Sequence, residues 1–494
     1  MNLLLLLDMA AAGRGDEIAV QAGDDRLTAG ELLAGAWSGA EVATGASALA
    51  YVGTNGLAFP LGLFAAAAAG VPFVPLNYRL GDDQLHDLLA PLGDTLVVAE
   101  AEAAAALAAR GHRVVDTAAF VATARAGTAV GDVPADGEGP AVLLHTSGTT
   151  AAPKAAVLRH RHLTSYVIGT VEFGAAGPDE AVLVSVPPYH VAGLANLLSN
   201  LYLGRRIVYL TQFDADAWVG AVRAEAITNA MVVPTMLARI CDVLDADGAG
   251  LPSLRALSYG GARTPATVLQ RVMALLPDVD LTNAYGLTET SSTIAVLGPE
   301  DHRAARDGDA EATARLSSAG RVLPTVEVEV RGPLGDLRPA GEPGEIWVRG
   351  EQVSGEYAGR EAPLDAAGWF PTRDRGRLDA DGYLFIEGRS DDTIIRGGEN
   401  IAPAEIEEVL LRHPDILQVA VVGVPDDEWG QRIAAVVVAR PGTALDAAAV
   451  QDFARASLRG SKTPQDVTFA EALPFTETGK LLRRVVQADL LATP

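Results

Sequence analysis

The chain has 494 residues, 49% of them hydrophobic, and its 63 acidic against 38 basic residues give a net charge of −25 at pH 7. This hydrophobic content supports a large core and excludes a wholly disordered chain, while a single cysteine, Cys241, excludes a scaffold of internal disulfides and fits a reducing cytosol. Because the sequence has no polybasic run, neither nucleic acid nor an anionic membrane is expected as the main partner.

The N-terminus carries a short apolar run at 3–7, which Asp8 ends and no basic residue precedes. The run is too short for the core of a signal peptide and far too short to span a bilayer. It predicts the first turns of an amphipathic helix. Elsewhere, no run of about 18 residues is apolar throughout, so no membrane span is expected.

Strands and helices are predicted to alternate through the first part of the chain. Apolar runs indicate strands at 47–52, from Phe73 onward, at 96–99 and at 141–145, and Ala-rich runs indicate helices at 59–69, ended by Gly70, and at 101–110. The segment 125–140 is rich in Gly, Pro and Asp and is predicted to be a loop. Such alternation is typical of α/β layers with mostly parallel sheets.

The pattern changes near residue 320. Apolar and polar residues alternate at 326–332, 345–350 and 382–389, which predicts antiparallel strands. Strands at 418–425 and 432–440 are then mixed with helices at 403–413 and 446–458. We therefore expect an α/β fold, with a large N-terminal domain of layered sheets and helices over 1–390 that includes a β-rich subdomain, and a small mobile α+β domain over 391–494.

Lysine is rare: of the 38 basic residues only Lys154, Lys462 and Lys480 are lysines. A GC-rich genome, in which Arg codons displace Lys codons, accounts for the bias. A guanidinium fork is a poor substitute for a compact ammonium where a point charge meets a phosphate. The three lysines are therefore candidates for such contacts.

The segment 141–158, AVLLHTSGTTAAPKAAVL, has the composition of a phosphate-binding loop. An apolar strand leads into small and hydroxyl-bearing residues and the segment reaches Pro153-Lys154. Backbone N–H groups, hydroxyls and a lysine together suit an anion. The loop is not a Walker loop, because no Gly-Lys-Ser/Thr follows, and an ordinary loop is the competing interpretation.

The segment TSGTTAAPK resembles the pyrophosphate-binding loop of the adenylate-forming superfamily, which includes acyl- and aryl-CoA synthetases, peptide-synthetase adenylation domains and firefly luciferase. Further motifs follow in the family's order: YGLTE at 285–289, GWFPTRDRGRLDADGY at 368–383, GRSDDTIIRGGENIAPAEIEE at 388–408 and PFTETGKLLRR at 474–484. The resemblance covers 141–484, and the first 140 residues also fit the family's N-terminal region.

The resemblance implies two half-reactions. A carboxylate attacks the α-phosphate of ATP, giving an acyl-AMP and pyrophosphate, and a thiol then displaces AMP. The first step concentrates negative charge near phosphorus, so it needs cations and oriented donors rather than a protein nucleophile. We expect ATP with Mg²⁺, and CoA as the acceptor because GGEN at 397–400 and the lack of a fused carrier domain favour it.

The resemblance also implies which residues carry the first step. Lys480 would bridge the substrate carboxylate and the α-phosphate, Thr288 would contact the α-phosphate, and Glu289 would hold Mg²⁺. Asp374 would accept hydrogen bonds from the ribose hydroxyls, and Arg389 would support the ribose side. The other nucleotide contacts implied are Thr146, Ser147, Gly148, Thr149, Thr150 and Lys154 at the phosphates. Gly260, Gly261 and Ala262 would form the adenine-side loop and Tyr285 would stack on the adenine, and Gly286 is a further ATP- or AMP-binding residue.

For the second step, Asp391 would be the hinge of the small domain. Rotation about it would withdraw Lys480 and bring in Gly397 and Gly398, which leave room for the pantetheine arm. Lys462 would lie near the anionic tail of CoA, with a solvated loop as the alternative. His190, in VPPYHVAG, would lie near the acyl carbon and gate the pocket or orient the carboxylate, with a purely structural role as its alternative.

Three positions depart from the family's pattern. Ala151 and Ala155 replace glycines of the loop, and Arg373 replaces a glycine before Asp374. Where the backbone needs a positive φ, alanine costs roughly 1 kcal/mol or more. These changes put the handling of ATP in doubt, not the fold.

Three enzymatic readings stay open. The chain is expected to be a complete acyl-CoA ligase, but an enzyme that chiefly thioesterifies a premade acyl-adenylate, or a stand-alone adenylation enzyme that loads a carrier protein, also fits. A non-catalytic nucleotide-binding protein is disfavoured by the intact Lys480 and Glu289. The substrate is a small-molecule carboxylic acid, and a homodimer is an open expectation. Candidate residues for the acid pocket are Tyr189, His190, Gly193, Thr235, Tyr259, Gly261, Ala284 and Thr293.

Overall fold

The computed structural model describes residues 1–146, 154–476 and 480–492. Its first layer is a sheet in which pairing is parallel throughout except between the last two strands. In spatial order the strands are β6 (Arg113–Asp116), β5 (Thr95–Ala99), β3 (Ala48–Val52), β4 (Phe73–Pro75), β7 (Pro140–Thr146) and β8 (Lys154–Arg159). The strands and the parallel pairing predicted here are confirmed.

A second sheet is also mostly parallel, with antiparallel strands at both edges. Its spatial order is β15 (Arg321–Val322), β14 (Ser292–Leu297), β13 (Asp280–Leu287), β12 (Ala256–Gly260), β11 (Asn229–Val232), β9 (Ala181–Val184), β10 (Arg206–Tyr209), β1 (Ile18–Ala22) and β2 (Asp25–Thr28). The carboxyl end of β13 runs into the short 3₁₀ helix η2 (Thr288–Thr290), which carries part of the YGLTE motif.

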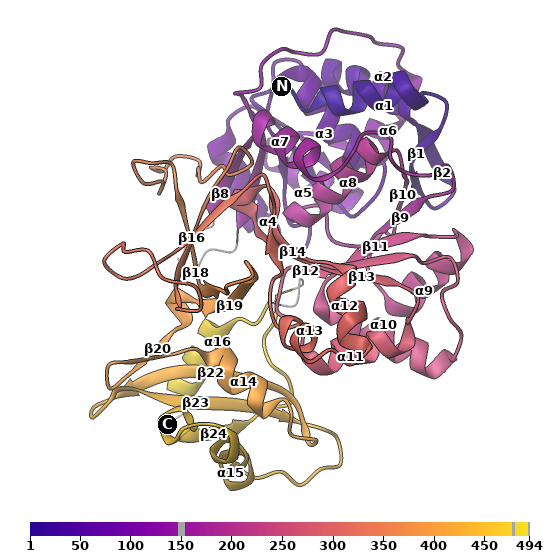
Figure 1. Cartoon of the computed structure of the whole chain (residues 1–494). Helices are drawn as coiled ribbons and strands as arrows, with labels where there is room; N and C mark the ends of the chain where they lie inside the picture. The colour runs from indigo at the N-terminus through magenta and orange to yellow at the C-terminus, as the bar shows by residue number, and fades with distance from the viewer. Residues whose placement is uncertain (147–153, 477–479, 493–494) are drawn as a thin grey trace.

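Helices pack on and between these sheets (Figure 1). They are α1 (Leu4–Arg14), α2 (Ala29–Val42), α3 (Ala58–Ala69), α4 (Asp82–Leu89), α5 (Ala101–Ala109), α6 (Thr117–Ala126), α7 (His160–Thr170), α8 (Val191–Leu203), α9 (Ala215–Ala224), α10 (Pro234–Asp247), α11 (Ala266–Leu275), α12 (Pro299–Arg306) and α13 (Ala310–Arg315), with the 3₁₀ helix η1 (Ala90–Leu92). One hydrophobic cluster joins both sheets through α1, α2, α3 and α8. None of the helices in the described part of the chain is long and apolar enough to cross a membrane.

The N-terminal helix forms as predicted, but its apolar face is broader than that of an ordinary amphipathic helix. Leu3, Leu4, Leu6 and Leu7 have no exposed surface. The reason is tertiary, because α1 lies against α2, α3 and α8 at once. Burial on several sides explains why nearly every residue of the first turns is apolar.

The predicted change of pattern corresponds to a separate antiparallel sheet, which runs in the order β16 (Glu327–Arg331), β17 (Gly344–Arg349), β18 (Phe370–Leu378) and β19 (Leu384–Arg389). It has its own hydrophobic cluster, including Ile346, Val348, Phe370 and Leu384. The β-rich subdomain expected from the alternation is thus confirmed. The motif at 368–383 contains β18, and the pairing of β18 with β19 places Asp374 directly opposite Arg389.

The C-terminal part is an α+β arrangement with its own core, drawn in orange and yellow below β19 in Figure 1. Its strands are β20 (Ile394–Arg396), β21 (Glu399–Ile401), β22 (Ile416–Asp426), β23 (Gly430–Ala439) and β24 (Asp466–Phe469). Its helices are α14 (Pro403–Leu410), α15 (Ala447–Ser457) and α16 (Arg483–Ala492), with the 3₁₀ helices η3 (Ser390–Asp392) and η4 (Gly460–Lys462). The predicted fold class is confirmed, whereas the domain boundary at 390 stays a prediction.

Candidate active site

Tyr285, Asp374 and Arg389 form a compact polar group where the second sheet meets the β-rich subdomain. The hydroxyl of Tyr285 donates to Asp374 Oδ2 at 2.5 Å, and Arg389 Nη1 lies 3.0 Å from Asp374 Oδ1. Asp374 is only 6% exposed. Both oxygens of a buried carboxylate therefore have partners, which fixes its orientation.

Burial dominates the titration of this group. It raises the pKa of Asp374, although Arg389 and the hydrogen bond from Tyr285 act in the opposite direction. Burial and the neighbouring Asp374 carboxylate raise the pKa of Tyr285 well above its usual range. Tyr285 is consequently a neutral hydrogen-bond donor at physiological pH. Its predicted stacking on adenine and the ribose role of Asp374 stay predictions.

Glu289 lies in η2, at the end of β13. The η2 turn is closed by Leu287 N–H, which donates to Thr290 Oγ1 at 3.0 Å, and Ser291 follows in the left-handed region with φ of 56°. This conformation turns the chain sharply into β14 and leaves Thr288 and Glu289 half-buried at the tip. Glu289 Oε1 accepts a hydrogen bond from the hydroxyl of Tyr357 at 2.6 Å.

Lys154 begins β8, directly after the segment that lies outside the described residues. Its backbone pairs with that of Thr146 at the end of β7. Lys154 Nζ lies 5.6 Å from the ring centroid of Tyr357, the residue that also contacts Glu289. The structure thus brings Lys154 and Glu289 to the same side chain. Four predicted phosphate-loop residues, Ser147, Gly148, Thr149 and Thr150, lie outside the described residues.

Lys480 reaches this region from the C-terminal part of the chain. Its backbone N–H donates to Thr476 Oγ1 at 3.0 Å. The residue as a whole is exposed, but the surrounding protein lowers the pKa of Lys480. The main cause is the loss of water around the ammonium, and the second is repulsion by the positive charge of Arg389. Asp374, Asp392 and Glu289 act the other way. The predicted catalytic lysine therefore lies in the field of the predicted ribose and metal residues.

The predicted adenine-side loop, 260–262, begins at the last residue of β12. Gly261 has φ of 83°, a conformation that favours glycine. Just after the loop, Arg263 forms an ion pair with Glu408 of α14, so this loop contacts the C-terminal part of the chain. Tyr259, a candidate for the acid pocket, is 1% exposed and its hydroxyl lies 2.8 Å from His302 Nε2. In this structure Tyr259 is a core residue.

The predicted hinge residue, Asp391, lies in η3. Its carboxylate is 4.0 Å from Arg373 Nη1, and Arg373 itself has φ of 61°. One of the three departures from the family pattern thus occupies a left-handed backbone position, where a Cβ is strained. Ala155 does not, because it lies within the extended β8 and pairs with His145. Ala151 lies outside the described residues.

Gly397 and Gly398 form the turn between β20 and β21, with φ of 56° and 83°. A Cβ on Gly397 would approach Trp429 Cε3 to 2.8 Å, so a side chain is excluded there. Lys462 lies elsewhere on the same part of the chain, and its Nζ contacts Glu405 Oε1 and Oε2 at 2.8 and 2.7 Å. Lys462 is thus part of an ion pair rather than a solvated loop charge, and its contact with CoA stays a prediction.

His190 occupies the N-cap position of α8, where its side chain makes no capping hydrogen bond. Its ring packs against Tyr189, with centroids 4.5 Å apart, and Tyr189 packs against Tyr78. Burial lowers the pKa of His190 to about 4, so the imidazole is neutral near pH 7. A neutral imidazole can orient a carboxylate by hydrogen bonding but contributes no charge.

Sequence reasoning missed Tyr357. It lies between the recognised motifs, in a segment without periodicity, and only its contacts with Glu289 and Lys154 mark it as part of the site. The same holds for Arg263, whose partner Glu408 is distant in sequence.

Comparison with known proteins identifies the family. Residues 7–358 match the family described as AMP-binding enzyme, and residues 405–480 match the AMP-binding enzyme C-terminal domain. The chain is 36% identical over 446 residues to a feruloyl-CoA synthase of Amycolatopsis sp, an alignment covering 89% of this chain and 88% of that protein. It is 34% identical over 454 residues to the indoleacetate–CoA ligase of Aromatoleum aromaticum, covering 88% and 86% respectively.

The fold is similar to that of o-succinylbenzoate CoA synthetase from Bacillus subtilis in complex with the acyl-adenylate intermediate. The TM-score is 0.84 at 25% identity, covering 98% of this chain and 97% of that one. The predicted resemblance to the adenylate-forming superfamily is confirmed. The chain belongs to the family of AMP-binding enzymes.

Proposed function

We propose that this protein is an acyl-CoA ligase that activates a carboxylic acid with ATP as an acyl-AMP and transfers the acyl group to CoA. The observation that carries the proposal is the position of Lys480, which lies in the field of Asp374, Arg389 and Glu289 although 91 or more residues separate it from each of them in sequence.

The first half-reaction follows from the charges. Lys480 neutralises the substrate carboxylate and the α-phosphate as they approach, and Thr288 donates to the same phosphate. Asp374, held by Tyr285 and Arg389, accepts from the ribose hydroxyls. Positioning and charge stabilisation are what a reaction without a protein nucleophile requires.

Mg²⁺ fits this site with Glu289 as its protein ligand. The described residues contain no cluster of three or more His, Cys, Asp or Glu side chains that could hold a metal alone. Mg²⁺ in nucleotide sites is usually held by one or two carboxylates together with phosphate oxygens and water. Glu289 supplies such a carboxylate, and the metal would neutralise phosphate charge beside Lys154.

For the second half-reaction, rotation of residues 391–494 about Asp391 withdraws Lys480 and presents the Gly397-Gly398 turn to the acyl-AMP. The turn is free of side chains because Trp429 leaves no room for a Cβ on Gly397. The thiol of CoA attacks the acyl carbon and AMP leaves. Lys462, paired with Glu405 in this orientation, is available to the anionic tail of CoA after an exchange of partners.

The acid is proposed to carry an aromatic ring, since relatives at 36% and 34% identity are named for feruloyl and indoleacetate groups.

A second candidate function is that of an enzyme that chiefly thioesterifies premade acyl-adenylates. One observation favours it, the left-handed backbone of Arg373 beside Asp374.

We also propose a cytosolic location, on the ground of the single, buried Cys241.

The test is incubation of purified protein with ATP, Mg²⁺, CoA and a panel of aryl and aliphatic acids, with AMP and acyl-CoA resolved by mass spectrometry. Parallel reactions replace acid and ATP with premade acyl-adenylates. Acyl-CoA from free acids supports the full ligase, and acyl-CoA from adenylates alone supports the second candidate. No acyl-CoA from either contradicts both. Light scattering on the same preparation tests for a homodimer.

A further inference from the structure

One short segment, residues 352–358, joins two parts of the candidate site, and we call it the strap. It follows β17 and lies between η2, which carries Glu289, and β8, which begins at Lys154. Gln352, Ser354 and Gly355 are buried. The strap is not part of a regular sheet, so its position depends on individual contacts.

On one side, the strap is bound to η2 and the turn after it. The backbone N–H groups of Ser354 and Gly355 donate to the carbonyl of Glu289 at 2.8 and 3.4 Å. Gln352 Nε2 donates to the carbonyls of Thr290 and Thr293 at 3.0 and 2.8 Å, and Ser291 Oγ donates to the Gln352 carbonyl at 2.9 Å. These bonds fix the backbone of Glu289.

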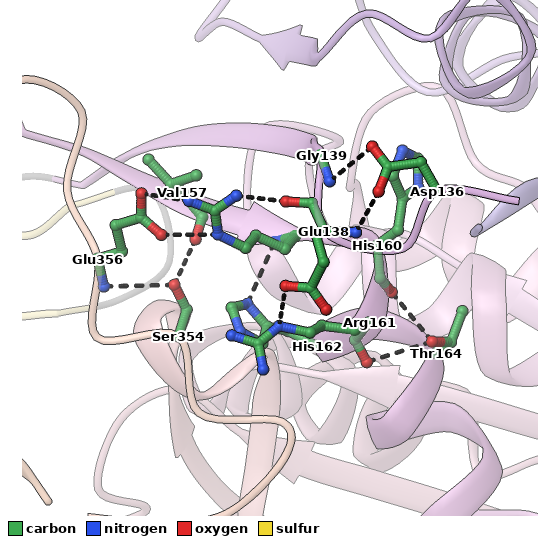
Figure 2. A network of polar contacts seen from close by, with 11 residues as sticks. Asp136, Glu138, Gly139, Val157, His160, Arg161, His162, Thr164, Ser354 and Glu356 are labelled. Atoms are coloured by element: carbon green, nitrogen blue, oxygen red, sulfur yellow. Dashed lines mark hydrogen bonds and ion pairs between the residues drawn. The ribbon is translucent and has the colours of Figure 1, made fainter. Parts of the chain in front are cut away.

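On the other side, the strap is bound to β8 and its end (Figure 2). Val157 N–H donates to the carbonyl of Glu356 at 2.9 Å, and Ala358 N–H to that of Ala155 at 2.9 Å. Arg159 Nε and Nη2 contact the two carboxylate oxygens of Glu356 at 2.9 and 2.8 Å. A bidentate pair of this kind fixes both distance and orientation.

Tyr357 lies at the centre of the strap and makes contacts with both functional side chains. Its hydroxyl donates to Glu289 Oε1 at 2.6 Å, and Lys154 Nζ lies 5.6 Å from its ring centroid. Its backbone is bridged to Ala156. Burial and the Glu289 carboxylate raise the pKa of Tyr357 above its usual range, so the hydroxyl stays a donor.

We propose that Tyr357 is a positioning residue for adenylation, holding the Glu289 carboxylate through its hydroxyl and the Lys154 ammonium over its ring, so that both face the phosphates of ATP. The inference rests on the proposed function of Glu289 and Lys154. A free glutamate samples several rotamers, and a donor on Oε1 leaves Oε2 and the second lone pair of Oε1 for Mg²⁺. Partners of this type typically change metal affinity or activity by about 10–100-fold.

The test is Tyr357→Phe, which keeps the ring beside Lys154 and removes only the hydroxyl. The matched control is Tyr383→Phe, because the hydroxyl of Tyr383 donates to Asp301 at 2.8 Å outside the site. We expect ATP–pyrophosphate exchange of Y357F to fall by about 10–100-fold and to recover partly at high Mg²⁺. Thioester formation from a premade acyl-adenylate should be unchanged, as should both activities of Y383F.

A binding measurement tests the role of Tyr357 without relying on enzymatic activity. Calorimetry with a non-hydrolysable ATP analogue should show that Y357F loses the gain in affinity that Mg²⁺ gives the wild type, while the metal-free affinity stays the same. Tyr357→Leu, which also removes the ring, should weaken the metal-free affinity as well because Lys154 loses its contact with the ring.

The inference is overturned if Y357F behaves like Y383F in both measurements, or if it loses exchange and thioester formation equally together with thermal stability, which would indicate a merely structural role. If the wild type shows no exchange with any acid, the proposed adenylation fails, and the calorimetric comparison alone decides the role of Tyr357.

Discussion

The hydroxyl of Tyr285 donates a 2.5 Å hydrogen bond to Asp374, and this donor opposes the burial that raises the pKa of Asp374. Only the ionised carboxylate can accept from two ribose hydroxyls while remaining paired with Arg389. Protonation should therefore weaken nucleotide binding. Since the pKa is raised, the affinity should fall as pH is lowered, beginning above the usual range for an aspartate.

Replacing the donor tests this relationship. Tyr285→Phe removes one of the hydrogen bonds that stabilise the ionised Asp374, while its burial is unchanged. The pKa of Asp374 should therefore rise further, and the loss of nucleotide affinity should begin at a higher pH. The measurement is calorimetric titration with an ATP analogue between about pH 7 and pH 4. If Y285F and the wild type lose affinity at the same pH, the hydrogen bond does not govern the titration of Asp374.

Lys480→Ala should separate the two half-reactions. Removing a charge that stabilises the developing negative charge typically costs about 10²–10³ in rate, so ATP–pyrophosphate exchange should fall by that factor. Thioester formation from a premade acyl-adenylate should persist, because the proposed rotation of the small domain would take Lys480 away from the site. Arg484→Ala, which removes an exposed charge from the same segment, is the control.

The wild type should also lose exchange at alkaline pH. The pKa of Lys480 is lowered by burial and then by Arg389, so the ammonium loses its proton below the usual range for a lysine. Equal loss of both half-reactions in K480A would contradict the assignment to adenylation alone.

Local patterns were sufficient for much of the fold. Ala48–Val52 and Thr95–Ala99 are buried on both faces of a parallel sheet and therefore read as continuous apolar runs, whereas Glu327–Arg331 is covered on one face and alternates. The breadth of the buried surface of α1 could not be predicted, because it depends on three helices that meet only in the folded chain.

The sequence yields candidate site residues where a motif fixes a residue type at a given spacing. Asp374 and Glu289 are candidates through their motifs, but the contacts that orient them could not be predicted from those motifs. Tyr357 follows Glu289 by 68 positions, and nothing in its neighbourhood marks a bond to that carboxylate. Side-chain partners joined across subdomains leave no periodic signal in a single sequence.

Arg373→Gly should stabilise the protein. A residue with a Cβ in the left-handed region destabilises the folded state by about 1–2 kcal/mol, and glycine removes this strain. Glycine also makes the unfolded chain more flexible, which offsets about 0.5–1 kcal/mol of that gain. The contact with Asp391 at 4.0 Å is exposed and contributes little. The net gain should be about 0.5–1 kcal/mol, measured as a higher urea midpoint.

Arg373→Ala separates backbone strain from charge, because it removes the guanidinium but keeps the Cβ. It should give no gain in stability. If Arg373 limits adenylation through its backbone, exchange should rise in R373G and not in R373A. Equal midpoints for the two variants would show that the left-handed conformation is not strained at this position.

Two buried histidines predict a loss of stability in acid. His160 and His162 are 3% and 2% exposed, and burial lowers the pKa of each to about 4. The neutral form is also required by hydrogen bonding, since His160 Nδ1 accepts from Leu3 N–H and His162 Nδ1 from Arg159 N–H, at 3.1 and 3.2 Å. Protonation of Nδ1 would abolish either bond.

The direction of this pH dependence follows from the pKa of each histidine in the folded and in the unfolded chain. Between about pH 6.5 and pH 4 the unfolded chain binds a proton that the folded chain does not, so the free energy of unfolding falls by up to about 1.4 kcal/mol per pH unit for each residue. Urea unfolding at successive pH values measures this slope. His160→Asn and His162→Asn keep an acceptor near the Nδ1 position without the titration, so each should flatten the slope by up to that amount. Slopes parallel to that of the wild type would show that other groups cause the acid sensitivity.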